Sequence, residues 1–175
     1  KTVIALMVDI HIEKFVNKRE IVQKWFMTED TKHPGVKRLI QSGDYIISGK
    51  VLIINKPSAY IRSHELTPYQ SRKIFFDNLW ETIVAFHTRN IPHRGHEFIQ
   101  KIALSITNAD ALYISPVVGN KGRSDFASEI VIAAYNQLIK LGVYNSVPVI
   151  IGGFNTYSRF CGPREAVFTA ICRQN

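Results

Sequence analysis

Strand and helix patterns alternate in a regular order along the second half of the chain. Short apolar runs predict strands at 82–86, 111–118 and 147–151, and apolar residues at helical spacing predict helices at 97–107 and 128–141. Parallel strands are joined by helical crossovers, so this order predicts a parallel sheet in an α/β domain. Ligands of such sheets bind at the carboxyl ends of the strands, and we expect the functional site there.

The first part of the chain has a different pattern, which is typical of a small β-rich domain. Gly and polar residues separate short elements there. The predicted elements are a buried strand at 2–8, a helix at 13–25, a turn at 28–35, a helix at 36–42 ended by Gly43, and two short β runs within 45–54 around Ser48-Gly49. We therefore expect a hairpin at the end of this part.

A boundary between two domains is predicted where proline and polar residues interrupt the apolar pattern, near residues 56–66. Directly after it, Thr67-Pro68 has the residue types of a helix N-cap and first helical position. A helix is therefore expected to run to about Asn78. The sequence predicts one domain over residues 1–60 and a second over residues 61–175.

Composition and charge narrow the class of protein. The chain is 46% hydrophobic and 21% charged, and its longest apolar run, near 147–151, is too short for a transmembrane helix. Cys161 and Cys172 lack disulfide or metal-site spacing and no secretory signal pattern occurs, so we expect a cytoplasmic protein without a protein-bound metal. A net charge of +8 favours anionic ligands, which include phosphate, sulfate and nucleic acid.

Polar and basic residues cluster directly after the predicted strand at 82–86, over residues 87–96 (H-T-R-N-I-P-H-R-G-H). His93 and His96 lie three positions apart at a helix start. Both rings can point the same way, beside free backbone N–H groups and the positive end of the helix dipole. Gly95 between them permits close approach of a ligand. Two surface histidines that only cap a helix are the alternative, but the preceding buried strand favours an anion site.

The segment 87–96 resembles the Q-T-R-N-P-x-H-R-A-H motif of ATP sulfurylase, also called sulfate adenylyltransferase, a family of the nucleotidylyltransferase superfamily. Four further segments are similar to motifs of that family in the same order, and together the five segments identify the chain as a member of it. They are residues 28–36 (T-E-D-T-K-H-P-G-V), Leu66-Thr67-Pro68 with Arg72, residues 116–119 with Lys121 and Asp125-Phe126, and residues 159–166 (R-F-C-G-P-R-E-A). Although His33 matches the family, we expect it to shape a turn rather than bind a ligand.

The resemblance implies a fold and an activity. The fold would be a Rossmann-like nucleotidylyltransferase parallel sheet, preceded by part of a small β-rich PUA-like domain. The activity would be transfer of AMP from ATP, bound with Mg²⁺, to sulfate, giving adenosine 5′-phosphosulfate and pyrophosphate. A sulfate oxygen is itself the nucleophile, so positioning and charge stabilisation suffice. The resemblance also implies a homo-oligomer whose partners are ATP and sulfate, and we expect neither membrane nor nucleic-acid binding.

By the same resemblance, four residues of this segment would be catalytic. Arg89 would bind sulfate, Asn90 would donate to the phosphoryl oxygens in the transition state, and His93 and His96 would hold the ATP phosphates. A guanidinium suits a tetrahedral oxyanion because its planar fork offers parallel donors. Further candidates for binding substrate or nucleotide are His87, Thr88, Lys121, Arg159 and Arg164, with Arg123 ranked beside these basic residues. For the basic ones, a solvated charge or an ion pair with Asp125 or Glu165 is the alternative.

Three features depart from the family pattern. His87 stands where the family has a sulfate-contacting Gln, although a neutral imidazole can still donate one N–H. Ile91-Pro92 replaces Pro-x, and Ser115 replaces a His. These departures leave open a nucleotidylyltransferase for another oxyanion acceptor, and a non-catalytic nucleic-acid-binding module is the alternative from a different class. No segment resembles the family's G-R-D-H-A-G loop, and by the resemblance the chain begins inside the PUA-like domain. We therefore expect a piece that is truncated at both ends and inactive alone.

Overall fold

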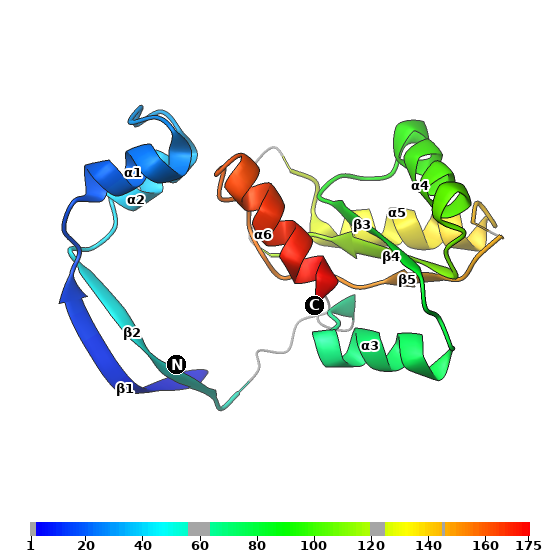
Figure 1. Ribbon diagram of the computed structural model, residues 1–175, viewed down its shortest axis with the longest axis horizontal. Coiled ribbons are helices and arrows are strands. Elements are labelled where there is room, and N and C mark those ends of the chain that lie inside the picture. Colours follow the sequence, from blue (N-terminus) through cyan, green and yellow to red (C-terminus); the bar gives the residue numbers. More distant parts are fainter. Residues whose placement is uncertain (1–2, 56–63, 120–124, 145) are drawn as a thin grey trace. The chain divides into compact units, whose positions relative to one another are not determined.

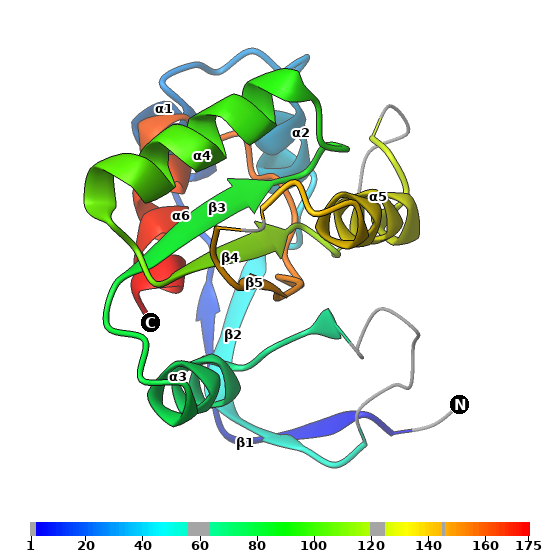
Figure 2. The same ribbon diagram turned by 90° about the vertical axis from the view of Figure 1, so that its right-hand side faces the viewer.

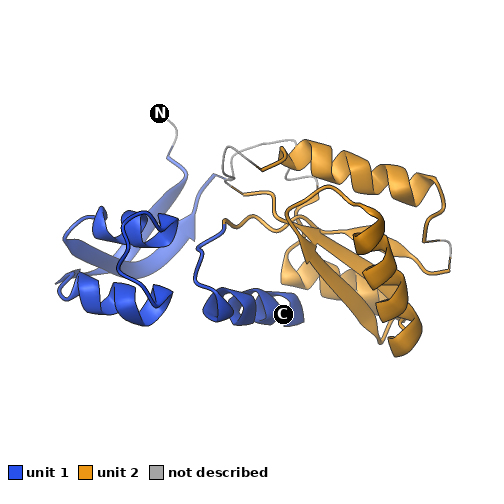
Figure 3. Cartoon of the chain, turned by 90° about the horizontal axis from the view of Figure 1, so that it is seen from above, with its two compact units in different colours: residues 1–58, 158–175 blue, residues 59–157 orange. Residues whose placement is uncertain are grey.

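The chain divides into two compact units (Figure 3). The computed structural model describes residues 3–55, 64–119, 125–144 and 146–175. One unit contains residues 1–58 and 158–175, and the other contains residues 59–157. Among the described residues, no helix is long and apolar enough to cross a membrane. The division into domains 1–60 and 61–175 stays a prediction, since compactness groups the last residues with the first.

The unit of residues 59–157 is built on a parallel sheet in the order β3–β4–β5 (Figure 1). Its elements are α3 (Pro68–Asp77), β3 (Ile83–Thr88), α4 (Arg94–Thr107), β4 (Ala111–Pro116), α5 (Ser128–Lys140) and β5 (Val149–Ile151). The α/β class and the parallel sheet are therefore confirmed. In the register of β3 and β4, His87 lies beside Ser115 and Thr88 beside Pro116. The carboxyl ends of these two strands thus meet at one edge.

Helices cover both faces of this sheet (Figure 2). Ile114 of β4 is fully buried in an apolar cluster with Leu104 of α4 and Tyr135 of α5. Its neighbour Tyr113 contacts Phe75 of α3, with 6.0 Å between ring centroids. Because side chains alternate across a strand, α4 and α5 pack on one face and α3 packs on the other.

Helix α3 begins at the residues that the sequence predicted. Thr67 Oγ1 accepts a hydrogen bond from the Gln70 N–H at 3.3 Å, and Gln70 Oε1 accepts one from the Thr67 N–H at 2.9 Å. Pro68 occupies the first helical position. This capping box satisfies two backbone donors, so the local sequence fixes the start of the helix.

The other unit contains a two-stranded antiparallel ribbon and three helices. Its elements are β1 (Ala5–Lys14), α1 (Lys18–Phe26), α2 (Pro34–Ile40), β2 (Tyr45–Ile53) and α6 (Pro163–Gln174). β1 pairs with β2 along nearly its whole length. Every residue of both strands is exposed to solvent within the described chain.

Residues 45–54 do not form the predicted hairpin. β2 is one continuous strand, in which Ser48 pairs with His11 of β1. Gly49 follows it opposite a bulge in β1, and a Cβ at Gly49 would lie 2.8 Å from the Val8 carbonyl oxygen. Gly49 therefore permits close approach of the bulged strand rather than a turn.

β1 is longer than the predicted strand at 2–8. Residues 9–13 alternate polar and apolar side chains, and the strand continues to Lys14. Helix α1 consequently begins at Lys18 instead of Glu13. The period-two alternation, rather than the polar content of the segment, was the correct signal there.

His33 caps helix α2. Its Nδ1 accepts a hydrogen bond from the Val36 N–H at 3.3 Å, so His33 shapes the backbone as a helix cap, and the expectation that it does not bind a ligand stays a prediction. Gly35 lies against the ring of Phe26, and a Cβ there would be 2.7 Å from the Arg159 carbonyl oxygen. This close approach joins the residues before α6 to the N-terminal part of the same unit.

Candidate active site

The turn between β3 and α4 carries the predicted catalytic residues. β3 ends at Thr88, beside Pro116 of β4, and α4 begins at Arg94 with His93 as its N-cap. The backbone of His93 is extended, and its Nδ1 accepts a hydrogen bond from the Gly95 N–H at 3.1 Å. Because Nδ1 accepts, the neutral ring carries its proton on Nε2, which is then a donor.

His93 and His96 stack on one another at this helix start. Their ring centroids are 3.8 Å apart, and the ring planes are inclined by 25°. His96 also contacts the ring of Phe86 in β3, with 5.4 Å between centroids and 69° between planes. The expected common orientation of the two histidines is confirmed, and their roles toward a ligand stay predictions.

The surroundings of His96 favour its neutral form. Burial lowers the pKa of His96, the neighbouring His93 lowers it further, and the backbone of Ile91 opposes both effects. Its Nδ1 is buried and has no hydrogen-bond partner among the residues that the structure describes. A neutral ring avoids repulsion from the positive end of the helix dipole and can still donate one N–H.

Thr88 and Asn90 form a compact turn at the end of β3. The Thr88 side chain is buried, and its Oγ1 accepts a hydrogen bond from the Asn90 N–H at 3.1 Å. The same hydroxyl donates to the Asn90 carbonyl oxygen at 3.3 Å. Arg89 and Asn90 are themselves exposed. An internally bonded strand end therefore presents two exposed polar side chains just before His93.

His87 is bonded to the neighbouring strand. Its Nδ1 lies 3.2 Å from the Ser115 carbonyl oxygen of β4. A carbonyl oxygen only accepts, so Nδ1 donates and the neutral ring has no proton on Nε2. Two positions at which the sequence departs from the family pattern are thus bonded to each other. The single N–H of neutral His87 is used within the protein, and only the protonated ring has a second one for an anion.

The remaining basic candidates are not on this turn. Lys121 and Arg123 lie outside the residues that the structure describes. Arg159 and Arg164 belong to the unit that contains α6. Glu165 Oε1 accepts a hydrogen bond from the Arg159 backbone N–H at 2.7 Å. The ligand roles of these four basic residues stay predictions.

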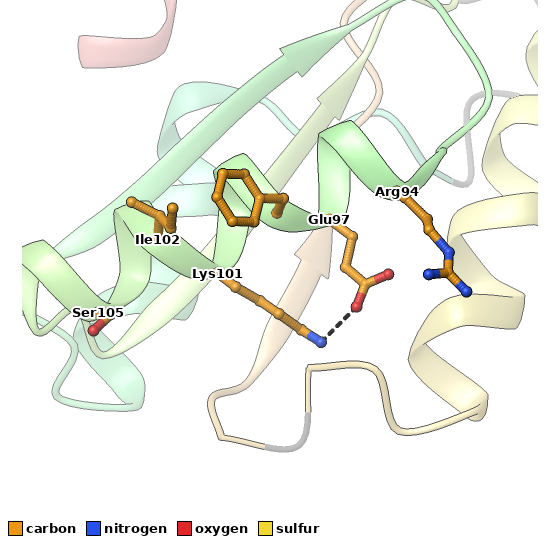
Figure 4. A pocket seen from close by; sticks show the side chains of 6 residues that line it. Arg94, Glu97, Lys101, Ile102 and Ser105 are labelled. Atoms are coloured by element: carbon orange, nitrogen blue, oxygen red, sulfur yellow. Dashed lines mark hydrogen bonds and ion pairs between the residues drawn. The ribbon is translucent and has the colours of Figure 1, made fainter.

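A groove of about 730 Å³ runs along the exposed side of α4 (Figure 4). Glu97 and Lys101 form an ion pair within it, with 2.6 Å between Oε1 and Nζ. The lining residues all come from one helix and are Arg94, Glu97, Phe98, Lys101, Ile102 and Ser105. The groove includes none of the turn histidines, so it is not part of the candidate site.

Gln100 is a residue near the site that the sequence analysis missed. It lies one turn after His96 on α4 and is fully buried, with 0% of its surface exposed. The signal was a polar residue on the stripe formed by His96, Gln100 and Leu104, which faces the sheet.

Within the described part of the chain, no three His, Cys, Asp or Glu side chains could hold a metal ion together.

Comparison with known families assigns both parts of the chain. Residues 62–175 match the ATP-sulfurylase family, and residues 1–56 match a PUA-like domain. These matches agree with the mixed α/β fold and its parallel sheet. The Rossmann-like sheet preceded by a PUA-like part, which the sequence implied by resemblance, is therefore confirmed.

Curated relatives are similar along most of this chain. A protein named sulfate adenylyltransferase from Staphylothermus marinus is 40% identical over 159 residues, which cover 91% of this chain and 41% of the relative. Its namesake from Thermococcus onnurineus is 39% identical over 168 residues, which cover 95% and 44%. The chain thus spans about two fifths of the length of these relatives. Since the family match extends over more than half of its residues, the chain belongs to the ATP-sulfurylase family.

Proposed function

We propose that the full-length protein is a sulfate adenylyltransferase, which transfers AMP from ATP to sulfate. A sulfate oxygen attacks the α-phosphorus, the bond to the β-phosphate bridging oxygen breaks, and pyrophosphate leaves. The observation that carries this proposal is the stacked pair His93 and His96 at the start of α4, on a turn that follows the carboxyl end of the parallel strand β3. Curated relatives with that name support the choice of acceptor.

The two histidines would hold the ATP phosphates. His93 has a donor at Nε2 because its Nδ1 accepts the Gly95 N–H. His96 is kept neutral by burial, so it can donate without adding a cation to the helix start. The free N–H groups of the first helical turn add further donors for anionic oxygens. These donors would tighten as charge develops on the leaving pyrophosphate.

Arg89 and Asn90 would act on the sulfate and on the reacting phosphoryl group. Both side chains are exposed at the end of β3, where a ligand of a parallel sheet is expected. Arg89 would bind sulfate through parallel N–H donors, and Asn90 would donate to the phosphoryl oxygens. His87 and Thr88 remain proposed binding residues. Further proposed binding residues, away from this turn in the sequence, are Lys121, Arg159 and Arg164.

Mg²⁺ would enter this site on the phosphates of ATP, as part of the substrate. The turn from His87 to His96 contains no Asp or Glu, so its donor set suits phosphate oxygens rather than a magnesium ion. Mg²⁺ usually keeps several waters and binds through substrate phosphates. The residues of this chain therefore have only to bind and orient the phosphates. We further propose a cytoplasmic homo-oligomer, with no nucleic-acid partner.

A second oxyanion acceptor is the alternative, and one observation favours it. Neutral His87 already donates its N–H to the Ser115 carbonyl, so it offers no donor to a fully ionised sulfate. The roles of His93 and His96 toward ATP are the same for either acceptor.

Pyrophosphate release from Mg·ATP by the full-length protein tests both functions. We expect release in the presence of sulfate and little release with phosphate or without an acceptor. Release with another oxyanion but not with sulfate would replace the proposed acceptor. Titration with Mg·ATP at two salt concentrations addresses the nucleic-acid alternative, because phosphate-backbone binding weakens steeply with salt whereas a nucleotide pocket selects ATP over other triphosphates.

A further inference from the structure

A network of buried polar groups lies next to the turn that carries Asn90. Gln100 of α4 and Tyr135 of α5 are both 0% exposed, and Tyr144, which follows α5, is 3% exposed. Tyr135 and Tyr144 belong to the apolar cluster that packs against the sheet. Burying polar atoms in such surroundings costs free energy unless they are hydrogen-bonded. Packing alone therefore does not explain why these three polar side chains are buried.

Tyr144 forms one end of this network. Its hydroxyl donates a hydrogen bond to Gln100 Oε1 at 2.6 Å. Burial raises the pKa of Tyr144 to about 12, and the nearby Tyr135 and Glu97 raise it in the same direction. Tyr144 therefore keeps its proton and remains a donor. Because this bond uses Gln100 Oε1, the Gln100 Nε2 group remains as a donor for another neighbour.

The middle of the network is the Tyr135 hydroxyl, which has the Gln100 and Thr88 side chains beside it. Burial raises the pKa of Tyr135, and the Thr88 and Gln100 side chains beside its hydroxyl only partly offset that effect. Tyr135 Oη and Gln100 Nε2 are buried, and neither has a hydrogen-bond partner within 3.5 Å in the described parts of the chain. Both groups are thus next to the polar atoms that could satisfy them.

The other end of the network is the turn formed by Thr88 and Asn90. Thr88 Oγ1 accepts the Asn90 N–H and donates to the Asn90 carbonyl oxygen. A hydroxyl has one proton and two acceptor lone pairs, so Thr88 Oγ1 can still accept one more hydrogen bond. Tyr135 is the buried donor beside it. Donors and acceptors therefore alternate correctly from Tyr144 through Gln100, Tyr135 and Thr88 to Asn90.

We propose that Tyr135 and Gln100 are positioning residues for the substrate-binding turn. With nucleotide bound, Gln100 Nε2 donates to Tyr135 Oη, and Tyr135 Oη donates to Thr88 Oγ1. These two hydrogen bonds complete the network and fix the Thr88 hydroxyl. The backbone of Asn90 is thereby held so that its side chain can reach the phosphoryl oxygens. Hydrogen bonds in catalytic sites often tighten only in the complex, and linked bonds strengthen one another. The effect on turnover rests on the function proposed above, whereas the effect on the turn requires only that Mg·ATP binds, and exchange of the Asn90 amide is therefore measured with Mg·ATP present.

The test uses variants of the full-length protein that remove single polar groups. Tyr135→Phe removes only the hydroxyl, and Gln100→Met replaces the amide with an apolar side chain of similar length. Tyr113→Phe is the matched control, because Tyr113 lies on β4 but faces α3. The readouts are hydrogen exchange of the Asn90 amide, kcat, KM for ATP, and Tm. A merely structural role would lower Tm without a selective change at Asn90.

We expect Tyr135→Phe and Gln100→Met to speed exchange of the Asn90 amide at least fivefold relative to Tyr113→Phe. We also expect about tenfold lower kcat with KM for ATP changed less than twofold. In an Asn90→Ala background, Tyr135→Phe should cause no further loss of kcat, since both changes act on one group. Gln100→Met decides the matter if Tyr135→Phe does not fold.

Wild-type Asn90 exchange and wild-type kcat in both variants would overturn the proposal. An additive loss in the Asn90→Ala background would also contradict it, because Tyr135 would then act elsewhere. If the wild-type protein shows no sulfate-dependent turnover but Tyr135→Phe still speeds Asn90 exchange, the proposed function fails while the positioning role stands. The two proposals are therefore tested separately.

Discussion

Two segments of the chain place a His-x-Gly sequence at the start of a helix, and they differ in what surrounds the histidine. His33 precedes Pro34-Gly35 and caps α2, and His93 precedes Arg94-Gly95 and caps α4. In both, Nδ1 accepts a backbone N–H, at 3.3 Å and 3.1 Å. The local sequence therefore produces a histidine N-cap twice, with the donor at Val36 in α2 and at Gly95 in α4.

The rings of these two histidines have different neighbours. His33 is partly buried between Phe26 and Phe160, with 5.2 Å and 6.3 Å between ring centroids. His93 is exposed and stacks on His96 at 3.8 Å. Aromatic packing occupies His33, whereas His93 presents an Nε2 donor beside a second imidazole. A histidine cap by itself thus only stabilises the start of a helix. We expect an anion site at His93 rather than at His33, because of the second imidazole beside it.

The largest difference is expected between His93→Asn and His33→Asn. Asparagine keeps a capping acceptor at both positions, so folding should be preserved. Loss of the His93 Nε2 donor should lower kcat by about 10²-fold or more, because that donor would act on developing charge. His33→Asn should leave kcat within about twofold. Steady-state kinetics of both full-length variants checks this, and equal activities would remove the distinction.

The glycines of the two caps should also differ. A Cβ at Gly35 would meet the Phe26 ring and would lie 2.7 Å from the Arg159 carbonyl oxygen. Gly35→Ala should therefore destabilise the fold by about 1–3 kcal/mol. At Gly95 a Cβ would meet only the His93 ring, at 3.0 Å, so Gly95→Ala should be tolerated. Urea unfolding of the two variants measures the difference, and equal midpoints would contradict it.

Arg89 is a further difference between the two segments, because it lies four residues before His93 whereas Glu29 stands at that distance before His33. Arg89→Lys keeps the charge but loses the parallel donors of the guanidinium. We expect the KM for sulfate to rise about tenfold, which is about 1.4 kcal/mol, with the KM for ATP little changed. An unchanged dependence of rate on sulfate would exclude Arg89 from the sulfate site.

The smallest expected effect is a pH dependence of stability at His96. Its pKa is lowered in the folded protein, so as pH falls the unfolded chain takes up the proton first. The stability that neutral His96 contributes is present above about pH 6.5 and is lost as pH falls through the lowered folded pKa. His96→Asn should therefore narrow the fall in Tm between about pH 7 and pH 5. Parallel Tm curves for wild type and variant would be the contrary result.

The sequence predicted the sheet and the turn because their signals are local. The apolar runs of β3, β4 and β5 and the capping box at Thr67 each lie within a few residues. The stacking of His93 and His96 follows from their spacing at a helix start. Parallel order followed from the alternation of strands and helices. The geometry that positions the candidate site was therefore accessible without the structure.

The remaining features depend on contacts between distant residues. The local sequence predicts a turn at Gly49, but the role of this glycine is set by Val8 across the ribbon. The bond from His87 to Ser115 needs the register of two strands, and the buried position of Gln100 needs the packing of α4 on the sheet. Helix α6 was not predicted, because its hydrophobic residues are spread around the helix and none is buried. Local patterns carry no information on these contacts.

The most direct test of the central claim is the formation of adenosine 5′-phosphosulfate from Mg·ATP and labelled sulfate by the full-length protein. Wild type, His33→Asn and His93→Asn are compared under identical conditions. We expect labelled product from wild type and His33→Asn at similar rates, and a rate at least about 10²-fold lower from His93→Asn. Similar rates from all three proteins, or no product from wild type, would contradict it.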